Sequence, residues 1–366
     1  MKCRHVFLLF LLAINFPAYS QYTSQQLDNS YGLSNSCINS IYQDSDNLIW
    51  FGTWDGLNFF DGSKVHVFNY ERTDLERNSI SSNVIYQVEG DKKRNIWVGT
   101  VEGVSKFNKN TGDFSNYFYS RQKAVSNGYI LAINTRGEVY AARRNSSQLF
   151  VYDDKLDRFR PVNIENLANF MLLNLFFDDQ DHLWLLKDNG KLEAFRRKGG
   201  RLVKLDGYVP VDNVDNAFYC DHQVFFQTKS DVLFRVTEGL VKQQILRLPH
   251  EVRAMSLFNG HYVFAWSSKG IGEYDAGFKP VNSLSTEMPV LQSERITSLI
   301  TDNNNLLWAG TDGNGVIKIA RKDNQFGIVQ QLANGQSFHI PVRAFCEVNG
   351  ELWIGTKGNG IITLMN

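Results

Sequence analysis

A short motif recurs along the chain and constrains its fold more than any other feature. Residues 47–62 read NLIWFGTWDGLNFFDG, and similar text returns as RNIWVGTVEGVSKF from Arg94, NLLWAGTDGNGVIKIA from Asn305 and ELWIGTKGNGIITLMN from Glu351. When the tryptophans of these copies are aligned, four weaker copies between them fall into the same register. The eight aligned positions are Trp50, Trp97, Tyr140, Trp184, Phe225, Val263, Trp308 and Trp353. Their mean spacing of about 43 residues is the period of a propeller blade.

Alternating hydrophobicity and turn residues divide a unit into four short strands. In the first unit we expect strands at residues 38–43, 48–53, 57–60 and 65–68, with an Asp-Gly hairpin between the second and third. A sheet of this kind is apolar on both faces, so blades must stack on one another, and a ring leaves no face uncovered. The sequence therefore predicts an all-β fold, a β-propeller of four-stranded antiparallel blades with eight repeats counted, closed as a seven- or eight-bladed ring. Four tryptophans at the aligned positions are predicted to pack in its core, namely Trp97, Trp184, Trp308 and Trp353.

The two ends of the mature chain are expected to meet. The last unit stops after its third strand, at residues 361–365, and the segment 22–27 (YTSQQL) precedes the first unit. We therefore predict that residues 22–27 supply the missing outer strand of the last unit. This closes one propeller domain over residues 21–366.

Residues 1–20 have the composition of a signal peptide. Lys2 and Arg4 precede the apolar run 6–16, and Ala18 and Ser20 provide small residues at the two positions that a signal peptidase reads. The run is shorter than the about 20 residues that a membrane helix needs. We expect cleavage after Ser20 and a periplasmic protein with no membrane span after signal removal.

Charge and cysteine content argue against nucleic-acid binding and against a disulfide framework. The chain has 38 basic and 38 acidic residues, which gives no electrostatic reason to expect nucleic-acid binding. Beyond residue 20 the cysteines are Cys37, Cys220 and Cys346, an odd number at wide spacing. They are predicted to be buried small side chains, not a disulfide framework.

The strongest copies resemble the regulator-propeller repeats of bacterial two-component sensors. The resemblance rests on residues 32–62 and 80–107, with Gly-Leu-Ser, an apolar strand ending in Gln-Asp, Leu-Trp-x-Gly-Thr and then Gly-Leu. In that family the propellers are periplasmic sensors of hybrid two-component systems, which commonly detect breakdown products of complex glycans. The resemblance implies seven blades per propeller, usually two propellers in tandem, and then a small sandwich domain, a membrane helix and a histidine kinase. Eight counted units leave two arrangements open: an eight-bladed ring, or a seven-bladed ring followed by the first unit of a second propeller.

Several functions stay open at this point. The resemblance implies a ligand-sensing propeller that binds an oligosaccharide or another small ligand. The alternatives are a scaffold for a protein partner or a dimer, and a truncated remnant of a longer sensor histidine kinase. A propeller lyase or hydrolase would need converging titratable residues. Because the sequence has none of the common catalytic or nucleotide-binding motifs, we expect neither an enzyme nor a cofactor.

Candidate ligand-binding residues lie on the hairpins between the second and third strands, which gather on one face of a propeller. Sugar recognition needs flat aromatic rings and planar polar groups. Trp54 stands where other units have Val, Asp or Lys, and Trp266 replaces an expected Thr. Packing between hairpins at the rim is the alternative role for both. The candidate set is Trp54, Asp55, Arg143, Arg144, Trp266, Asp312, Asn314, Lys357 and Asn359.

Three histidines suggest a metal site at first sight. His182, His222 and His261 each precede the second strand in three consecutive units. Equivalent positions on stacked sheets should be about 10 Å apart, whereas zinc binds nitrogen at about 2 Å. We therefore expect no metal site there.

Overall fold

The computed structural model describes residues 21–70, 78–118, 128–144, 146–162, 164, 171–322, 341–348 and 351–365. The expected signal peptide, residues 1–20, lies outside this part of the chain. The described residues form mostly β-strands and divide into two compact units, Met1–Arg321 (unit 1) and Lys322–Asn366 (unit 2). No helix among them is long and apolar enough to cross a membrane.

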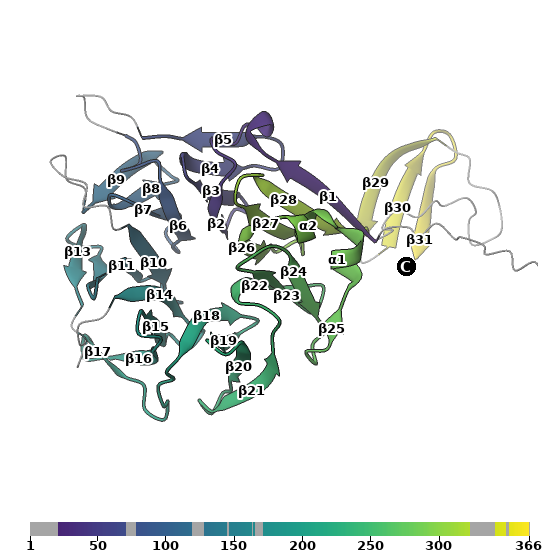
Figure 1. Ribbon diagram of the computed structural model, residues 1–366. Helices are drawn as coiled ribbons and strands as arrows, with labels where there is room; N and C mark the ends of the chain where they lie inside the picture. The colour runs from purple at the N-terminus through teal and green to yellow at the C-terminus, as the bar shows by residue number, and fades with distance from the viewer. Residues whose placement is uncertain are drawn as a thin grey trace, which may run out of the picture. The chain divides into compact units, whose positions relative to one another are not determined.

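Seven four-stranded antiparallel sheets make up the described part of unit 1, and their first strands surround the centre of a ring (Figure 1). Blade one consists of β2 (Ile38–Gln43), β3 (Ile49–Thr53), β4 (Gly56–Phe60) and β5 (Val65–Phe68). Blade two consists of β6 (Ile85–Gly90), β7 (Asn95–Thr100), β8 (Val104–Asn108) and β9 (Asp113–Tyr117). Blade three consists of β10 (Tyr129–Ile133), β11 (Val139–Arg143), β12 (Leu149–Asp153) and β13 (Arg158–Pro161). Blade four consists of β14 (Leu172–Phe177), β15 (Leu183–Lys187), β16 (Leu192–Lys198) and β17 (Arg201–Lys204). Blade five consists of β18 (Val214–Cys220), β19 (Gln223–Thr228), β20 (Val232–Val236) and β21 (Lys242–Arg247). Blade six consists of β22 (Val252–Phe258), β23 (His261–Trp266), β24 (Ile271–Tyr274) and β25 (Pro280–Val281). Two short helices, α1 (Ser283–Glu287) and α2 (Val290–Ser293), lead from blade six to blade seven.

The seventh blade joins the two ends of unit 1. It contains β26 (Ile296–Thr301), β27 (Leu307–Thr311), β28 (Val316–Arg321) and, as its outer strand, β1 (Tyr22–Leu27), which a short 3-10 turn, η1 (Asn29–Tyr31), connects to blade one. Strand β1 pairs antiparallel with β28 along its full length, and β2 packs directly on β26. The N-terminal strand therefore closes a seven-bladed ring. The prediction that it completes the last repeat is wrong.

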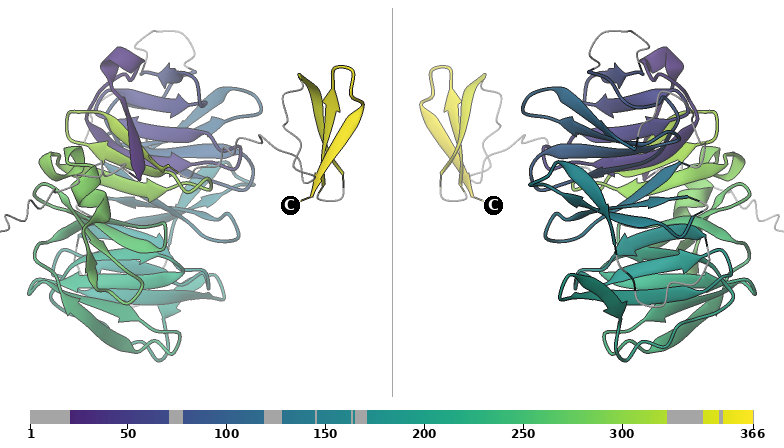
Figure 2. Two further views of the ribbon diagram at one scale, coloured as in Figure 1. Left: turned by 90° about the vertical axis from the view of Figure 1, so that its right-hand side faces the viewer. Right: turned by 90° about the vertical axis from the view of Figure 1, so that its left-hand side faces the viewer.

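Unit 2 is the eighth repeat, a three-stranded sheet drawn in yellow in Figure 2. Its strands are β29 (Val342–Val348), β30 (Glu351–Thr356) and β31 (Ile361–Met365). Trp353 is 37% exposed and Cys346 is exposed, so neither is packed in a core as predicted. The count of eight repeats is confirmed. The ring takes only seven of them, so the structure divides near residue 321 where the sequence predicted one domain over residues 21–366.

A hydrogen bond between Asp and Trp explains the spacing of the repeat. In the first blade Trp50 Nε1 donates to Asp44 Oδ2 at 2.7 Å, while Asp44 Oδ1 accepts the backbone N–H groups of Asp46 and Leu48 in the turn between β2 and β3. The same pair occurs in three other blades, as Trp97 with Asp91, Trp184 with Asp178 and Trp308 with Asp302. Each indole is buried and needs a partner for its N–H. The motif is therefore structural, and the predicted core packing of Trp97, Trp184 and Trp308 is confirmed.

Polar side chains also tie neighbouring blades together. Gln87 donates to the carbonyl oxygen of Leu131 at 2.7 Å and accepts the Leu131 N–H at 2.9 Å, which copies a pair of β-ladder bonds between blades two and three. Gln227 makes the same double contact with His250 and Val252 between blades five and six. These bonds satisfy backbone groups that the inner strands would otherwise leave unpaired. They hold the blades, and the hairpins at their ends, in fixed relative positions.

Glu89, at the end of β6, gives unit 1 a pH dependence. Burial raises the pKa of its carboxyl from about 4.5 to about 7, and a hydrogen bond from Gln87 Nε2 offsets part of that effect. Because the folded state binds the proton more tightly, this contribution to stability is complete below pH 4.5 and is lost as the pH rises through 7. We expect the free energy of unfolding to fall by roughly 1–3 kcal/mol over that range. Glu89→Gln should flatten the dependence in urea denaturation at pH 5 and 7.5, and an unchanged slope would contradict this assignment.

Candidate functional site

The hairpins between the second and third strands share one backbone anchor. The first hairpin residue donates its N–H to the carbonyl of the residue that precedes the innermost strand, as Trp54 does to Cys37 at 3.3 Å. The equivalent bonds in the other blades join Val101 to Val84, Arg144 to Gly128, Asp188 to Met171, Lys229 to Asn213, Ser267 to Glu251 and Asp312 to Arg295. Backbone geometry is thus fixed while the side chain is free to vary. Such a ring of variable side chains on a rigid frame is a suitable place for ligand recognition.

Trp266 does not belong to that ring, although the sequence predicted it as an aromatic binding residue. It stands one position earlier, where Thr53 of blade one accepts and donates hairpin hydrogen bonds through its hydroxyl. Its indole is only 5% exposed, stacked on Phe264 with centroids 6.1 Å apart and in edge contact with His250. A side chain at Gly272 would meet this indole at 2.2 Å, so the glycine makes room for it. Trp266 is a core residue, which corrects the prediction.

Trp54 and Asp55 do lie open on the hairpin face. The Trp54 side chain is 51% exposed, and Asp55 Oδ1 accepts a hydrogen bond of 2.8 Å from Asn83 Nδ2 of blade two. The Asn83 carbonyl accepts the Gly56 N–H at 2.8 Å, so the hairpin of blade one is held by the entry to blade two. The exposed indole is therefore carried on a backbone that is fixed at both ends.

Arg144 extends this surface to blade three. Its guanidinium carbon lies 4.4 Å from the centre of the Tyr86 ring, a cation–π contact between blades two and three. Tyr86 occupies the β-bulge of β6, which turns its side chain away from the regular alternation of the strand. Gly128, at φ +65°, leaves the space that the Tyr86 ring occupies. Tyr86 was missed by the sequence analysis because a bulge has no reliable sequence signal.

Asp312 extends this surface to blade seven. Asp312 forms an isolated β-bridge with Cys37, beside the anchor of Trp54, and its carboxylate lies 3.3 Å from Arg295. We call Asp312, Trp54, Asp55, Asn83, Tyr86 and Arg144 the hairpin-face arc, which runs over blades seven, one, two and three.

Besides Trp266, four predicted residues lie outside the arc in the described structure. Asn314 donates to Glu294 at 2.8 Å, and Arg143 is half-buried with its Nε atom enclosed and unbonded among the described residues. Lys357 and Asn359 are exposed on the corresponding hairpin of unit 2, so they belong to the other compact unit. Their positions in the repeat match those of Asp312 and Asn314.

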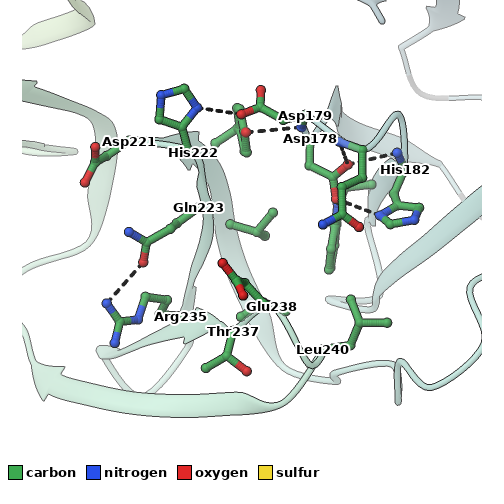
Figure 3. Close-up of a pocket in the computed structure, with 15 residues that line it drawn as sticks. Asp178, Asp179, His182, Asp221, His222, Gln223, Arg235, Thr237, Glu238 and Leu240 are labelled. Carbon is green, nitrogen blue, oxygen red and sulfur yellow. Dashed lines mark hydrogen bonds and ion pairs between the residues drawn. The ribbon is translucent and has the colours of Figure 1, made fainter. Parts of the chain in front are cut away.

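A cleft that the sequence did not predict lies between blades four and five (Figure 3). It is at the ends of the strands that point away from the hairpin face. It has a volume of about 400 Å³, with Trp184, Val224 and Val236 among its buried lining residues. At its rim Asp179 Oδ2 lies 2.5 Å from His222 Nδ1. This contact raises the pKa of His222, and together with Tyr219 it lowers the pKa of Asp179. The pair bridges two turns and offers hydrogen-bonding groups above an apolar floor.

The three histidines noted in the sequence each pair with a separate carboxylate. His182 lies 3.0 Å from Asp178, His222 contacts Asp179, and His261 lies 2.7 Å from Glu273. Within the described ranges, no group of three or more His, Cys, Asp or Glu residues could hold a metal ion. The shared role of these histidines is to bind acidic groups of their own or the adjacent blade.

The sequence is similar to a described repeat family and to a bacterial histidine kinase. A family model described as two component regulator propeller matches residues 32–55, which include Trp54 and Asp55. Histidine kinase P4 of Formosa agariphila is 25% identical over 144 residues, covering 27% of this chain and 10% of that protein.

Solved structures share the fold of the chain. The extracellular domain of BT3049, assigned to a hybrid two component system of B. thetaiotaomicron, gives a TM-score of 0.66 at 21% identity, over 94% of this chain and 48% of that one. A catalytically inactive virginiamycin B lyase from Staphylococcus aureus gives 0.59 at 10% identity, over 82% and 99%. The chain thus spans about half of the extracellular domain that it matches and a tenth of the kinase. At these identities the structures show the fold alone. The chain is therefore a β-propeller in fold, and its residues 32–55 match the two component regulator propeller model.

Proposed function

We propose that this chain is the ligand-sensing propeller of an exported two-component sensor, and that it binds an oligosaccharide on the hairpin-face arc without catalysing a reaction. The observation that carries this proposal is Trp54, half exposed on a hairpin that is anchored on both sides. The repeat family and the similarity to a histidine kinase and to an extracellular sensor domain support the sensing role. The expected leader at residues 1–20 supports a periplasmic location.

The chemistry of the arc suits a sugar. The C–H face of a pyranose can stack on an exposed indole, which offers a flat apolar surface with little conformational freedom to lose. The arc also carries the planar polar groups of Asp55, Asn83 and Arg144, which can bond to vicinal hydroxyls. Because these side chains are already held by contacts between blades, little ordering entropy is lost on binding.

A panel of plant, host and microbial oligosaccharides tests the proposal on residues 21–366. One glycan class should raise the unfolding temperature, and Trp54→Ala should weaken its binding about tenfold or more in calorimetry, since truncation of a central aromatic contact commonly costs over 1 kcal/mol. Lys229→Ala is the matched control, because Lys229 holds the same hairpin position in blade five. Equal loss in both variants, or none in Trp54→Ala, would contradict the role of the arc.

A protein-binding role is the second candidate, and unit 2 favours it. Phe345 is 66% exposed, Ile361 64% and Trp353 37% on one three-stranded sheet. A blade needs a neighbour on both faces, so we propose that this sheet packs on further propeller blades or on a protein partner. A stable partner in pull-down experiments, together with no sugar affinity, would favour this scaffold function over ligand sensing.

A further inference from the structure

We propose that a pocket between blades three and four binds a small oxyanion, namely a sulfate, phosphate or carboxylate group. The pocket has a volume of about 170 Å³ and shares no lining residue with the hairpin-face arc. It is lined by Tyr140, Val151, Arg160, Pro161, Val162, Arg197, Gly200, Arg201 and Leu202. We call it the arginine pocket, and the inference is independent of the proposed sugar site.

The charge of the lining points to an anion. Three arginines line the pocket, and no carboxylate belongs to its lining. Arg160 Nε is 2.7 Å from Asp153, and Arg197 bonds to Glu138 through Nη1, so each uses only part of its guanidinium. Arg201 makes no ion pair within the described chain. Since a guanidinium carries five N–H donors and cannot lose its proton, the pocket keeps unused donors and positive charge.

The walls of the pocket strengthen the electrostatic field of the arginines. Tyr140 and Leu202 are each 2% exposed, and Val151 and Pro161 add apolar surface beside the arginines. Low-polarity walls reduce the screening of the arginine charges by water. Arg197 and Arg201 stand on the two strands of one hairpin, where Arg197 pairs with Leu202 and Lys198 pairs with Arg201. The ladder therefore fixes the backbone that carries two of the three arginines.

Size and geometry limit the ligand to one anionic group. A guanidinium presents two parallel N–H bonds that match two oxygens of a carboxylate, sulfate or phosphate. A larger groove of about 550 Å³ shares Val151, Arg160 and Arg197 with the pocket, and its lining carries acidic and basic side chains in similar number. An oxyanion attached to a neutral molecule would fit this arrangement, with the charge in the pocket and the remainder in the groove.

Calorimetric titration of residues 21–366 tests the inference, with sulfate, phosphate, glucuronate and glucose as separate ligands at constant ionic strength in sodium chloride. We expect oxyanion binding and no binding of glucose, and the ranking of the three anions identifies which group the pocket prefers. Arg201→Gln and Arg160→Gln should each raise the Kd about tenfold, as expected when one charge-assisted hydrogen bond is lost. Arg158→Gln is the control, because Arg158 is exposed on the same strand as Arg160 and does not line the pocket.

Two results would overturn the assignment. One is the absence of binding of all three oxyanions to the folded protein. The other is binding with an unchanged Kd in both Arg201→Gln and Arg160→Gln, which would place the anion elsewhere. Circular dichroism confirms that each variant is folded. Trp54→Ala should bind the oxyanion as the unmodified chain does, so failure of the sugar site and failure of the arginine pocket are distinguishable.

Discussion

Removal of residues 21–27 is expected to lower the free energy of unfolding of unit 1 by about 5 kcal/mol or more, which is comparable with the whole stability of many domains. Strand β1 pairs with β28 at six positions, from Tyr22 with Arg321 to Leu27 with Val316. Tyr22 and Leu27 are 5% and 0% exposed, and burial of each contributes about 2 kcal/mol. The lost ladder adds about 1 kcal/mol for each hydrogen bond. Urea denaturation followed by circular dichroism measures the loss.

A chain that ends at residue 321 is the control. Unit 2 forms a sheet of its own, and β1 has its partner within unit 1. Truncation at residue 321 should therefore change the stability of the ring by less than about 1 kcal/mol, the range of changes away from the core. The assignment of the closing strand fails if chains 28–366 and 21–366 unfold at the same urea concentration.

Replacement of Trp308 by Ala is expected to cost about 3–5 kcal/mol, the range for loss of a large aromatic side chain from a core. Trp308 is 2% exposed and packs against Phe51 and Phe60 of blade one, with ring centroids 6.1 and 6.0 Å away. Its Nε1 donates to Asp302 at 2.8 Å, and the substitution leaves that buried carboxylate without this partner. Equilibrium unfolding in urea gives the difference from the unmodified chain.

Trp353→Ala is the matched comparison, since Trp353 holds the same position in the eighth repeat. It is 37% exposed in unit 2, so its removal should change the unfolding of the ring by less than about 1 kcal/mol. Trp308→Phe should fall between the two, because it keeps most of the packing and loses the bond to Asp302. Equal losses for Trp308→Ala and Trp353→Ala would mean that both repeats lie in one cooperative ring.

The hairpin-face arc could be predicted only in part. Trp54, Asp55, Arg144 and Asp312 follow from the period of the repeat, because every blade places its hairpin at the same point of the register. Tyr86 depends on a bulge, and the burial of Trp266 depends on the space above Gly272. Both are consequences of packing, which a residue pattern along one strand does not contain.

The local sequence is enough to specify a blade. The spacing of Asp44 and Trp50, repeated in the other units, sets a turn and a buried strand through bonds within one blade. Tertiary structure decided where the ring closes. Residues 311–320 (TDGNGVIKIA) and 356–365 (TKGNGIITLM) have similar sequences and predict the same hairpin and strand. In the described structure, β1 pairs with the first of them. Local sequence fixes which segments form strands, but the partner of an edge strand depends on which blade the curvature of the ring brings to it.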